Sequence, residues 1–222
     1  MAEARRALDE LRAEKATRAK THKTDEAEKG EIRVSTTDPE ARMMRFSDGA
    51  VRAGYNVQLA VELGCGIIPA TQTSDRRNDA GLAGPMLEQV EQRLGQPPQR
   101  LLVDTHYATQ QDIVDFAARG IKVYTPVPPD KKEATAESQR KRAWRRQREL
   151  EAVKQWRERI SGEAGKAVYQ RRSRIETING ILKGRGLGIM RVRSIAKVAC
   201  AVLLRAIAHN LWRAHCLRTA TA

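Results

Sequence analysis

The sequence is poor in cysteine and histidine, and neither residue type has the spacing of a metal site. Its three cysteines, Cys65, Cys200 and Cys216, are odd in number and far apart. That usage is typical of reduced thiols in a cytosolic protein rather than of a disulfide framework. The four histidines are equally scattered. We therefore expect no structural zinc site.

Long uncharged apolar runs are also missing. The first ten residues mix acidic and basic side chains, so we expect no secretory signal. The most apolar helix that the pattern predicts, residues 195–211, is interrupted by Lys197 and Arg205. We interpret this helix as too short and too charged to span a bilayer. The expectation is a cytoplasmic, nucleoid-associated protein with no membrane partner.

Aromatic residues make up only 4% of the chain, and acidic residues are outnumbered, with 27 Asp and Glu against 41 Lys and Arg. The net charge of +14 predicts a polyanionic partner, and nucleic acid is the commonest one. The scarcity of aromatic rings for base stacking gives little support to an RNA-associated protein. A chain of 222 residues can bury one substantial core, and two small domains are also compatible with this length.

The amino-terminal part predicts little packed structure. Residues 2–20 are rich in good helix formers without sustained heptads, and a polar linker follows, so residues 1–30 are interpreted as a charged helix and linker. Residues 31–36 predict a short strand. Asp38-Pro39 then predicts a turn or a brief helix that ends before the turn at 47–49.

The middle of the chain alternates strands and helices. We expect a hairpin of residues 55–62 and 67–73, then a helix capped by Asn78 or Asp79 and ended by Gly95. The buried side of that helix should hold Leu82, Met86, Val90 and Leu94. A strand at 100–103 ending on Asp104, a helix at 110–118 and a strand at 121–125 follow. This order predicts an α/β fold with a partly parallel sheet, in which ligands bind beyond the carboxyl ends of strands such as the one before Asp104.

The remaining third is helical and basic. Residues 131–159 are densely charged, which predicts either a solvated helix tethered by its tryptophans or a lid that faces DNA. Ser161 and Glu163 should begin a helix that Gly184 and Gly186 end. Ser194 starts the last helix, whose expected core residues are Ile195, Val198, Val202 and Leu203.

Four polar residues, Tyr169, Arg172, Glu176 and Lys183, are separated by steps of 3, 4 and 7. On a helix these steps place all four on a stripe about 60° wide. A carboxylate between two cations and a phenol can hold a metal ion while its neighbours bind phosphate. By helical geometry alone, an amphipathic helix with a solvated basic face is the stronger interpretation. An adjoining apolar stripe, which would border a core, consists of Val168, Ile175, Ile178 and Leu182.

The spacing within Tyr169-Gln170-Arg171-Arg172-Ser173-Arg174-Ile175-Glu176 resembles the Tyr-Arg-Glu-Lys signature of DDE transposases from bacterial insertion sequences. The likeness extends in order from about Thr37 to Arg213. It includes Gly54-Tyr55-Asn56-Val57-Gln58, Leu102-Val103-Asp104-Thr105-His106-Tyr107, Gly186-Leu187, Met190-Arg191-Val192-Arg193, Ala196-Lys197-Val198 and Ala208-His209-Asn210-Leu211.

The resemblance implies a ribonuclease H-like mixed sheet flanked by helices over residues 31–213, with a basic helical insertion at about 130–162 and a tail at 214–222. It implies DNA transposition by phosphoryl transfer on two Mg²⁺ (or Mn²⁺) ions. Asp104 and Glu176 take the second and third metal-ligand roles. Tyr169, Arg172 and Lys183 would position duplex DNA at the ends of the insertion sequence, and Arg185 extends this positive track. A homo-oligomer on DNA is also compatible with the family.

The sequence departs from the family's pattern at two places. His106 stands where the family usually has glycine, which alters the backbone freedom next to Asp104. The Asp-Gly-Thr strand that carries the first aspartate is missing, and Asp38 and Asp48 are weak substitutes. The resemblance therefore predicts a fold lacking its first strand, in a chain truncated at its amino terminus. The alternative is a catalytically inactive, DNA-binding remnant of a transposase.

Overall fold

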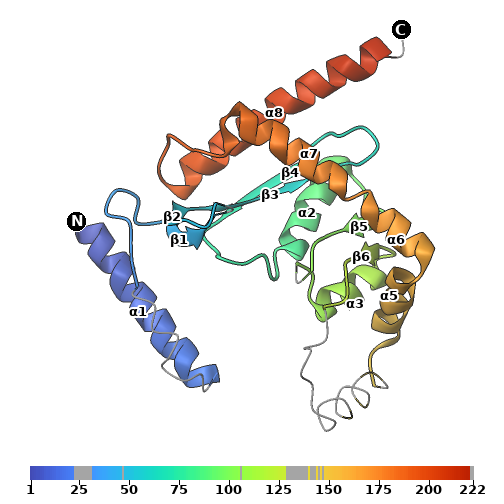
Figure 1. Cartoon of the computed structure of the whole chain (residues 1–222), viewed down its shortest axis with the longest axis horizontal. Helices are drawn as coiled ribbons and strands as arrows, with labels where there is room; N and C mark the ends of the chain where they lie inside the picture. Colours follow the sequence, from blue (N-terminus) through green and yellow to red (C-terminus); the bar gives the residue numbers. More distant parts are fainter. Residues whose placement is uncertain are drawn as a thin grey trace.

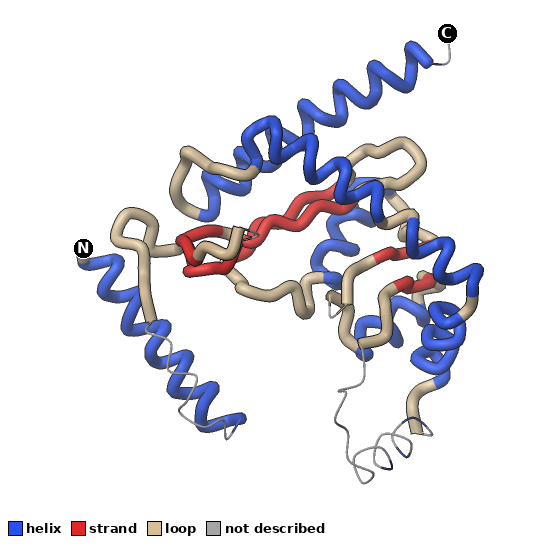
Figure 2. Tube along the Cα trace, in the orientation of Figure 1, coloured by secondary structure: helices blue, strands red, loops and turns tan. Residues whose placement is uncertain are grey.

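The computed structural model describes residues 1–22, 32–46, 48–105, 107–128, 140, 144, 146 and 148–220, with the side chains of 18–22 excepted. His106, the boundary near residue 30 and most of the basic segment from 131 to 147 lie outside the described residues. Helices and short strands alternate along the chain, as Figures 1 and 2 show, so the predicted α/β class is confirmed in this mixed sense.

The first helix, α1 (Ala2–His22), agrees with the helix predicted at 2–20. It stands to one side of the other elements (Figure 1). Its described contacts with them include an ion pair between Glu14 and Arg42, whose atoms are 4.0 Å apart. This distance is at the outer limit of an ion pair, so the contact contributes little stability. Ala4 of α1 is buried, with 8% of its surface exposed.

Strands β1 (Arg42–Arg45) and β2 (Val51–Gly54) form an antiparallel hairpin, with Arg42 opposite Gly54. The strand predicted at 31–36 is wrong for its described residues, 32–36, which are loop. Of the two alternatives predicted at Asp38-Pro39, the turn is confirmed and the brief helix is wrong: Ala41 N–H donates to the carbonyl of Asp38 at 3.1 Å, and residues 42–45 are strand. The turn signal closes the hairpin: Gly49 has φ 82° and Ala50 N–H donates to Asp48 Oδ1 at 3.0 Å. Pairing with β2 therefore outweighs the local preference of the β1 segment.

The predicted hairpin at 55–73 is confirmed. Strand β3 (Asn56–Ala60) pairs antiparallel with β4 (Ala70–Ser74), and Ala60 lies opposite Ala70. Successive residues of a strand point to opposite faces. Ala60 and Ala70 accordingly pack against α2 (Ala83–Leu94), whereas Leu59 packs on the other face against α7 (Ser173–Leu182) and α8 (Ile195–Ala220).

Helix α2 ends at Gly95, as predicted, with φ 72°. Leu82, Met86 and Val90 are buried, but Leu94 is 51% exposed, so its predicted place in the core is wrong. Leu87 is buried instead, in a core cluster that it shares with Ile113, Phe116 and Val123. The predicted side-chain cap is absent, since the residue at the cap position is Leu82.

Strands β5 (Arg100–Leu102) and β6 (Lys122–Tyr124) are parallel and are connected through α3 (Gln110–Ala118), as predicted. Thr109 and Asp112 form a capping box at the start of α3. Ile113 and Phe116 of α3 pack with Val153 and Trp156 of α5 (Glu151–Ser161). Among the described residues the strands form three separate pairs, and no continuous mixed sheet joins them.

The helix predicted from 161 to 184 is broken. It consists of α6 (Glu163–Gln170), α7 and the π-helical turn η1 (Lys183–Leu187). Arg172 N–H donates to the carbonyl of Tyr169, a tighter 3₁₀-type turn between α6 and α7. Gly186, with φ 90°, ends the helical run as predicted.

Helix α8 is longer than predicted and includes most of the expected tail at 214–222. Val198 and Val202 are buried as expected, but Leu203 is 37% exposed, and Ala206 and His209 occupy the core instead. With 26 residues, α8 is long and apolar enough to cross a membrane by length and composition alone. The prediction that it is too short was therefore wrong. The core helix of a folded domain meets the same criterion, and α8 packs on β4.

A buried glycine offers a test of how closely α6 packs against α5. A Cβ atom on Gly165 of α6 would lie 1.7 Å from the carbonyl oxygen of Arg159, whereas one on Gly180 of α7 meets nothing within 4 Å. Gly165→Ala should destabilise the protein by about 1–3 kcal/mol, since the backbone must move. Gly180→Ala should stabilise it by about 0.5–1 kcal/mol. Urea unfolding of both variants measures the difference, and equal stabilities would contradict the close packing of α6 on α5.

Candidate active site

Asp104 lies two residues after the end of β5, and its backbone is fixed by the neighbouring elements. Its carbonyl oxygen accepts a hydrogen bond from Thr125 Oγ1 at 2.9 Å and another from the N–H of Tyr107 at 3.1 Å. The carbonyl of Thr125 in turn accepts from Trp156 Nε1 at 3.1 Å. The Asp104 side chain remains 60% exposed. A rigid backbone therefore presents an open carboxylate beyond the end of a parallel strand, as the sequence predicts.

The guanidinium of Arg172 connects Asp104 with Glu176. Arg172 Nη1 lies 3.1 Å from Asp104 Oδ1, and Arg172 Nη2 donates to Glu176 Oε1 at 2.8 Å. Because one planar fork reaches both groups, the two carboxylates lie within about 8 Å of each other. The structure thus brings together the two predicted metal ligands from different parts of the chain.

Tyr169 completes this cluster. Its hydroxyl donates to Asp104 Oδ1 at 3.5 Å, and the Arg172 guanidinium lies 5.7 Å from the centre of its ring. Burial raises the pKa of the Tyr169 phenol, an effect that Arg172 opposes and Asp104 reinforces. The phenol is therefore a protonated donor at neutral pH.

Lys183 and Arg185 lie away from the carboxylates. Lys183 begins η1, is exposed, and stands two helical turns or about 10 Å along the axis from Glu176. Arg185 stacks on α8, with its guanidinium 4.9 Å from the centre of the Trp212 ring. The predicted stripe is therefore divided into a cluster at Asp104 and a second basic segment beside α8.

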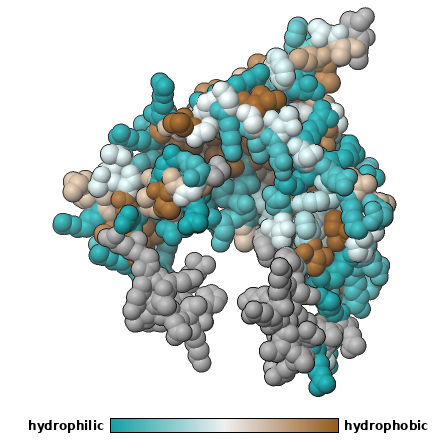
Figure 3. Space-filling view, viewed as in Figure 1, coloured by the Kyte–Doolittle hydropathy of each residue, from teal (hydrophilic) through white to brown (hydrophobic). Residues whose placement is uncertain are grey.

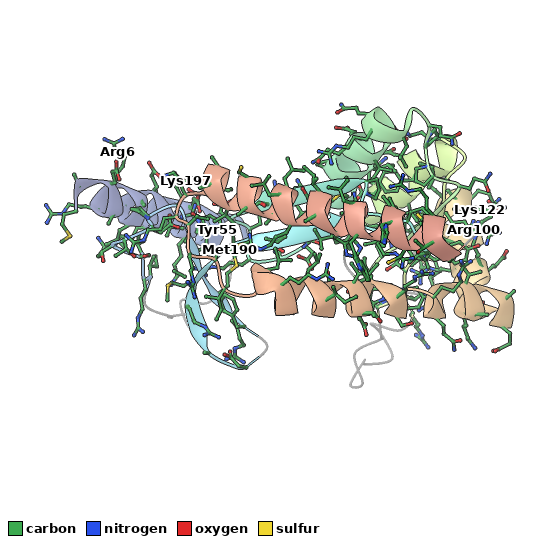
Figure 4. The ribbon with its side chains drawn as sticks, turned by 90° about the horizontal axis from the view of Figure 1, so that it is seen from above. Arg6, Tyr55, Arg100, Lys122, Met190 and Lys197 are labelled. Carbon is green, nitrogen blue, oxygen red and sulfur yellow. The ribbon has the colours of Figure 1, made fainter. Side chains whose placement is uncertain are left out.

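The two weak candidates for the first aspartate have structural roles. Asp38 accepts from the Tyr55 hydroxyl at 2.9 Å and from the N–H of Ser194 at 3.2 Å, which ties the loop before β1 to the start of α8. In Figure 4, Tyr55 lies far from Arg100 at the start of β5. Asp48 pairs with Arg52 across the β1–β2 turn, and the N–H of Ala50 is the main cause of its lowered pKa.

Asp79 is a candidate that the sequence analysis considered only as a helix cap. Its Oδ1 accepts from Asn56 Nδ2 at 2.6 Å and from Gln58 Nε2 at 2.8 Å. Burial raises the pKa of Tyr107, and the negative charge of Asp79 adds to this effect. Asp79 therefore lies near the turn that follows Asp104. The side chains of Asn56 and Gln58 point to the same side of a strand. This spacing was the sequence signal that could have indicated a shared polar partner such as Asp79.

The described part of the chain contains no cluster of three or more His, Cys, Asp or Glu residues able to hold a metal ion. Asp104 and Glu176 thus stand as a pair. Two hard carboxylate oxygens that already converge on one cation suit a divalent ion such as Mg²⁺, which commonly keeps water and phosphate as its other ligands.

The motif Ala208-His209-Asn210-Leu211 has a structural role rather than a place in this cluster. His209 is 1% exposed and its Nε2 lies 2.9 Å from the carbonyl oxygen of Gly66. Asn210 bonds both backbone groups of Ile68, and Arg213 donates to the carbonyl of Cys65. These bonds attach the turn between β3 and β4 to α8.

The chain belongs to the family described as transposase DDE domain, whose model matches residues 16–211. No curated protein and no solved structure matches the chain significantly. Membership supports a general role in transposition, an enzymatic ancestry and a DNA partner, and the family generally uses divalent metal ions.

The hydrogen-bond series behind Asp104 can be tested through Trp156, which is 3% exposed. Trp156→Phe leaves the carbonyl of Thr125 without its donor and should cost about 1–3 kcal/mol of stability. Trp144→Phe is the matched control, because Trp144 is 54% exposed, and should change stability by less than about 0.5 kcal/mol. If thermal unfolding shows equal effects, the indole bond does not support the site.

Proposed function

We propose that this chain is the carboxy-terminal portion of a bacterial insertion-sequence transposase that catalyses DNA cleavage and strand transfer by metal-dependent phosphoryl transfer. The observation that carries the proposal is that the guanidinium of Arg172 forms ion pairs with both Asp104 and Glu176. Family membership alone fixes no residue, but the contact of Arg172 with both Asp104, after β5, and Glu176, on α7, supports the proposal. These two acids are the residues expected to hold metal.

Asp104 and Glu176 would hold the divalent ions, Mg²⁺ or Mn²⁺, with two ions in a complete site. Such ions activate an attacking oxygen and offset charge at the phosphorus. The residues of this chain orient the reactants. Tyr169 offers a protonated hydroxyl to a phosphate, and Arg172 offers a planar fork that suits bidentate phosphate binding.

A third acidic ligand is expected on a further strand. The proposed ribonuclease H-like sheet would place an Asp-Gly-Thr strand beside β3 and β5. Each of these two strands is paired along only one edge within the described residues. Asp38 and Asp48 are bound to other groups. We therefore infer that the first ligand belongs to a polypeptide segment absent from this chain.

The DNA-binding surface would run from Tyr169 and Arg172 to Lys183 and Arg185. Figure 3 shows one face of the molecule, on which hydrophilic residues predominate. The net charge of +14 attracts the phosphate backbone of duplex DNA at insertion-sequence ends. Pairing of two ends would require a homo-oligomer on DNA.

A second candidate function is a catalytically inactive remnant that competes for those ends. The observation that favours it is a pair of carboxylates with no third metal-ligand residue beside them in the described part of the chain. Both functions require DNA binding, but only the first requires that cleavage appears when the missing strand is restored.

Duplex binding should depend strongly on salt. With Mg²⁺ present, three cations at Arg172, Lys183 and Arg185 predict a slope near −3 for the logarithm of the binding constant against that of the salt concentration. Lys183→Gln should weaken this slope by about 1. The exposed Lys122, at the start of β6, supplies the control Lys122→Gln, which should leave the slope unchanged. Fluorescence anisotropy at several salt concentrations measures both, and equal slopes would remove Lys183 from the surface.

Cleavage provides the second test. The purified chain should cut little or no DNA in Mg²⁺, and the same chain extended by an Asp-Gly-Thr strand, if the genomic DNA just upstream encodes one, should cut at element ends. In the extended chain Glu176→Gln should lower cleavage at least about 10³-fold while DNA affinity stays within about 2-fold. Glu163→Gln, on the exposed side of α6, is the control. Robust cleavage by the unextended chain would contradict the missing ligand.

A further inference from the structure

Arg172 occupies the position at which a metal ion would be held, and the proposal below rests on the proposed function. Its side chain is 23% exposed, whereas those of Asp104 and Glu176 are 60% and 64% exposed. The guanidinium is therefore enclosed more than the acids that it connects. It offsets part of the repulsion between two carboxylates that lie a short distance apart.

We propose that Arg172 is an exchangeable counter-ion. In the metal-free protein it holds Asp104 and Glu176 together, and a divalent cation displaces it from their oxygens. The same carboxylate oxygens serve the guanidinium and would serve the metal. A guanidinium and a divalent cation at one pair of carboxylates also repel each other, so one must leave.

After displacement, the Arg172 side chain would keep its contact with the Tyr169 ring and could bind a phosphate. Arg172 lies in the turn between α6 and α7, where no side-chain cap holds the start of α7. The Tyr169 ring, 5.7 Å from the guanidinium, offers a face on which the freed group can rest. Phosphate suits the same planar fork as a carboxylate does. Binding of metal therefore frees Arg172 for a phosphate of the DNA.

This exchange couples two binding events. Metal binding should raise the affinity of the chain for DNA through Arg172, and DNA should raise the affinity for metal by the same factor. A fixed DNA-binding arginine would show no such coupling. If Arg172 were only a structural ion-pair partner, replacing it would weaken metal binding, because the two carboxylates could then move apart.

The experiment uses the full chain and Mn²⁺ alone as the metal probe, with free Mn²⁺ followed by electron paramagnetic resonance. Arg172→Gln removes the competing charge and should bind Mn²⁺ about 5- to 10-fold more tightly than the unaltered chain. Arg172→Lys keeps the charge without the fork and should show a smaller gain. Arg171→Gln, a change at the exposed neighbouring position, should bind Mn²⁺ as the unaltered chain does. Circular dichroism establishes that each variant is folded.

A fluorescent duplex then measures the coupling. Mn²⁺ should raise the DNA affinity of the unaltered chain and of Arg171→Gln, and the rise should be lost in Arg172→Gln. Weaker or equal Mn²⁺ binding by both Arg172 variants, with a site that Asp104→Asn abolishes, overturns the exchange and leaves the proposed function intact. Mn²⁺ binding that neither Asp104→Asn nor Glu176→Gln alters overturns the proposed metal site itself.

Discussion

The arrangement of this molecule depends on one guanidinium that reaches two carboxylates on separate elements. Arg172 and Glu176 are one helical turn apart, so their contact is local. The contact with Asp104 is not, because 68 residues separate it from Arg172. It requires that the junction of α6 and α7 crosses the carboxyl end of β5. Without the Arg172 guanidinium, the negative charges of Asp104, after β5, and Glu176, on α7, would repel each other.

Two sets of contacts hold α7 in this position. Ile178 and Leu182 pack with Ile68 and Ala206, which places α7 between the β3–β4 hairpin and α8. Arg174 donates to the carbonyl of Leu63 at 2.6 Å, on the same turn that α8 holds through Asn210. The family motifs on α8 therefore contribute to the site indirectly, by fixing the position of other elements. They fix the hairpin that α7 rests on, and α7 carries Glu176.

The sequence predicts those parts of the molecule whose cause is local. Thr109 and Asp112 form a capping box, and the predicted bounds of α3 agree with the structure. Gly95 ends α2 because its φ of 72° suits glycine. Where the cause is a distant partner, prediction fails. The β1 segment becomes a strand only because β2 pairs with it, and Leu203 is exposed because β4 contacts another side of α8.

The candidate site shows the same division. The steps between Tyr169, Arg172 and Glu176 place them on one side of a helix, and the structure keeps them together even across the break at Arg172. Lys183 and Arg185 could not be placed from spacing alone, because the π-helical turn and Trp212 redirect the chain after α7. The proximity of Asp104 to Glu176 was expected only from the resemblance, since no periodicity connects a strand end to a later helix. The contact of Asp104 with Arg172 was not predicted.

The charge balance explains why a basic protein keeps an acidic pair at this place. Asp104 and Glu176 carry two negative charges and Arg172 returns one, so the cluster keeps one net negative charge within a chain of net charge +14. Replacing the guanidinium by a divalent cation would neutralise both acids and leave Arg172 unpaired. The local field then becomes positive, which favours the phosphate that the reaction must hold. Under the proposed exchange, the acidic pair would make phosphate binding by Arg172 conditional on metal, a condition that a uniformly basic surface cannot impose.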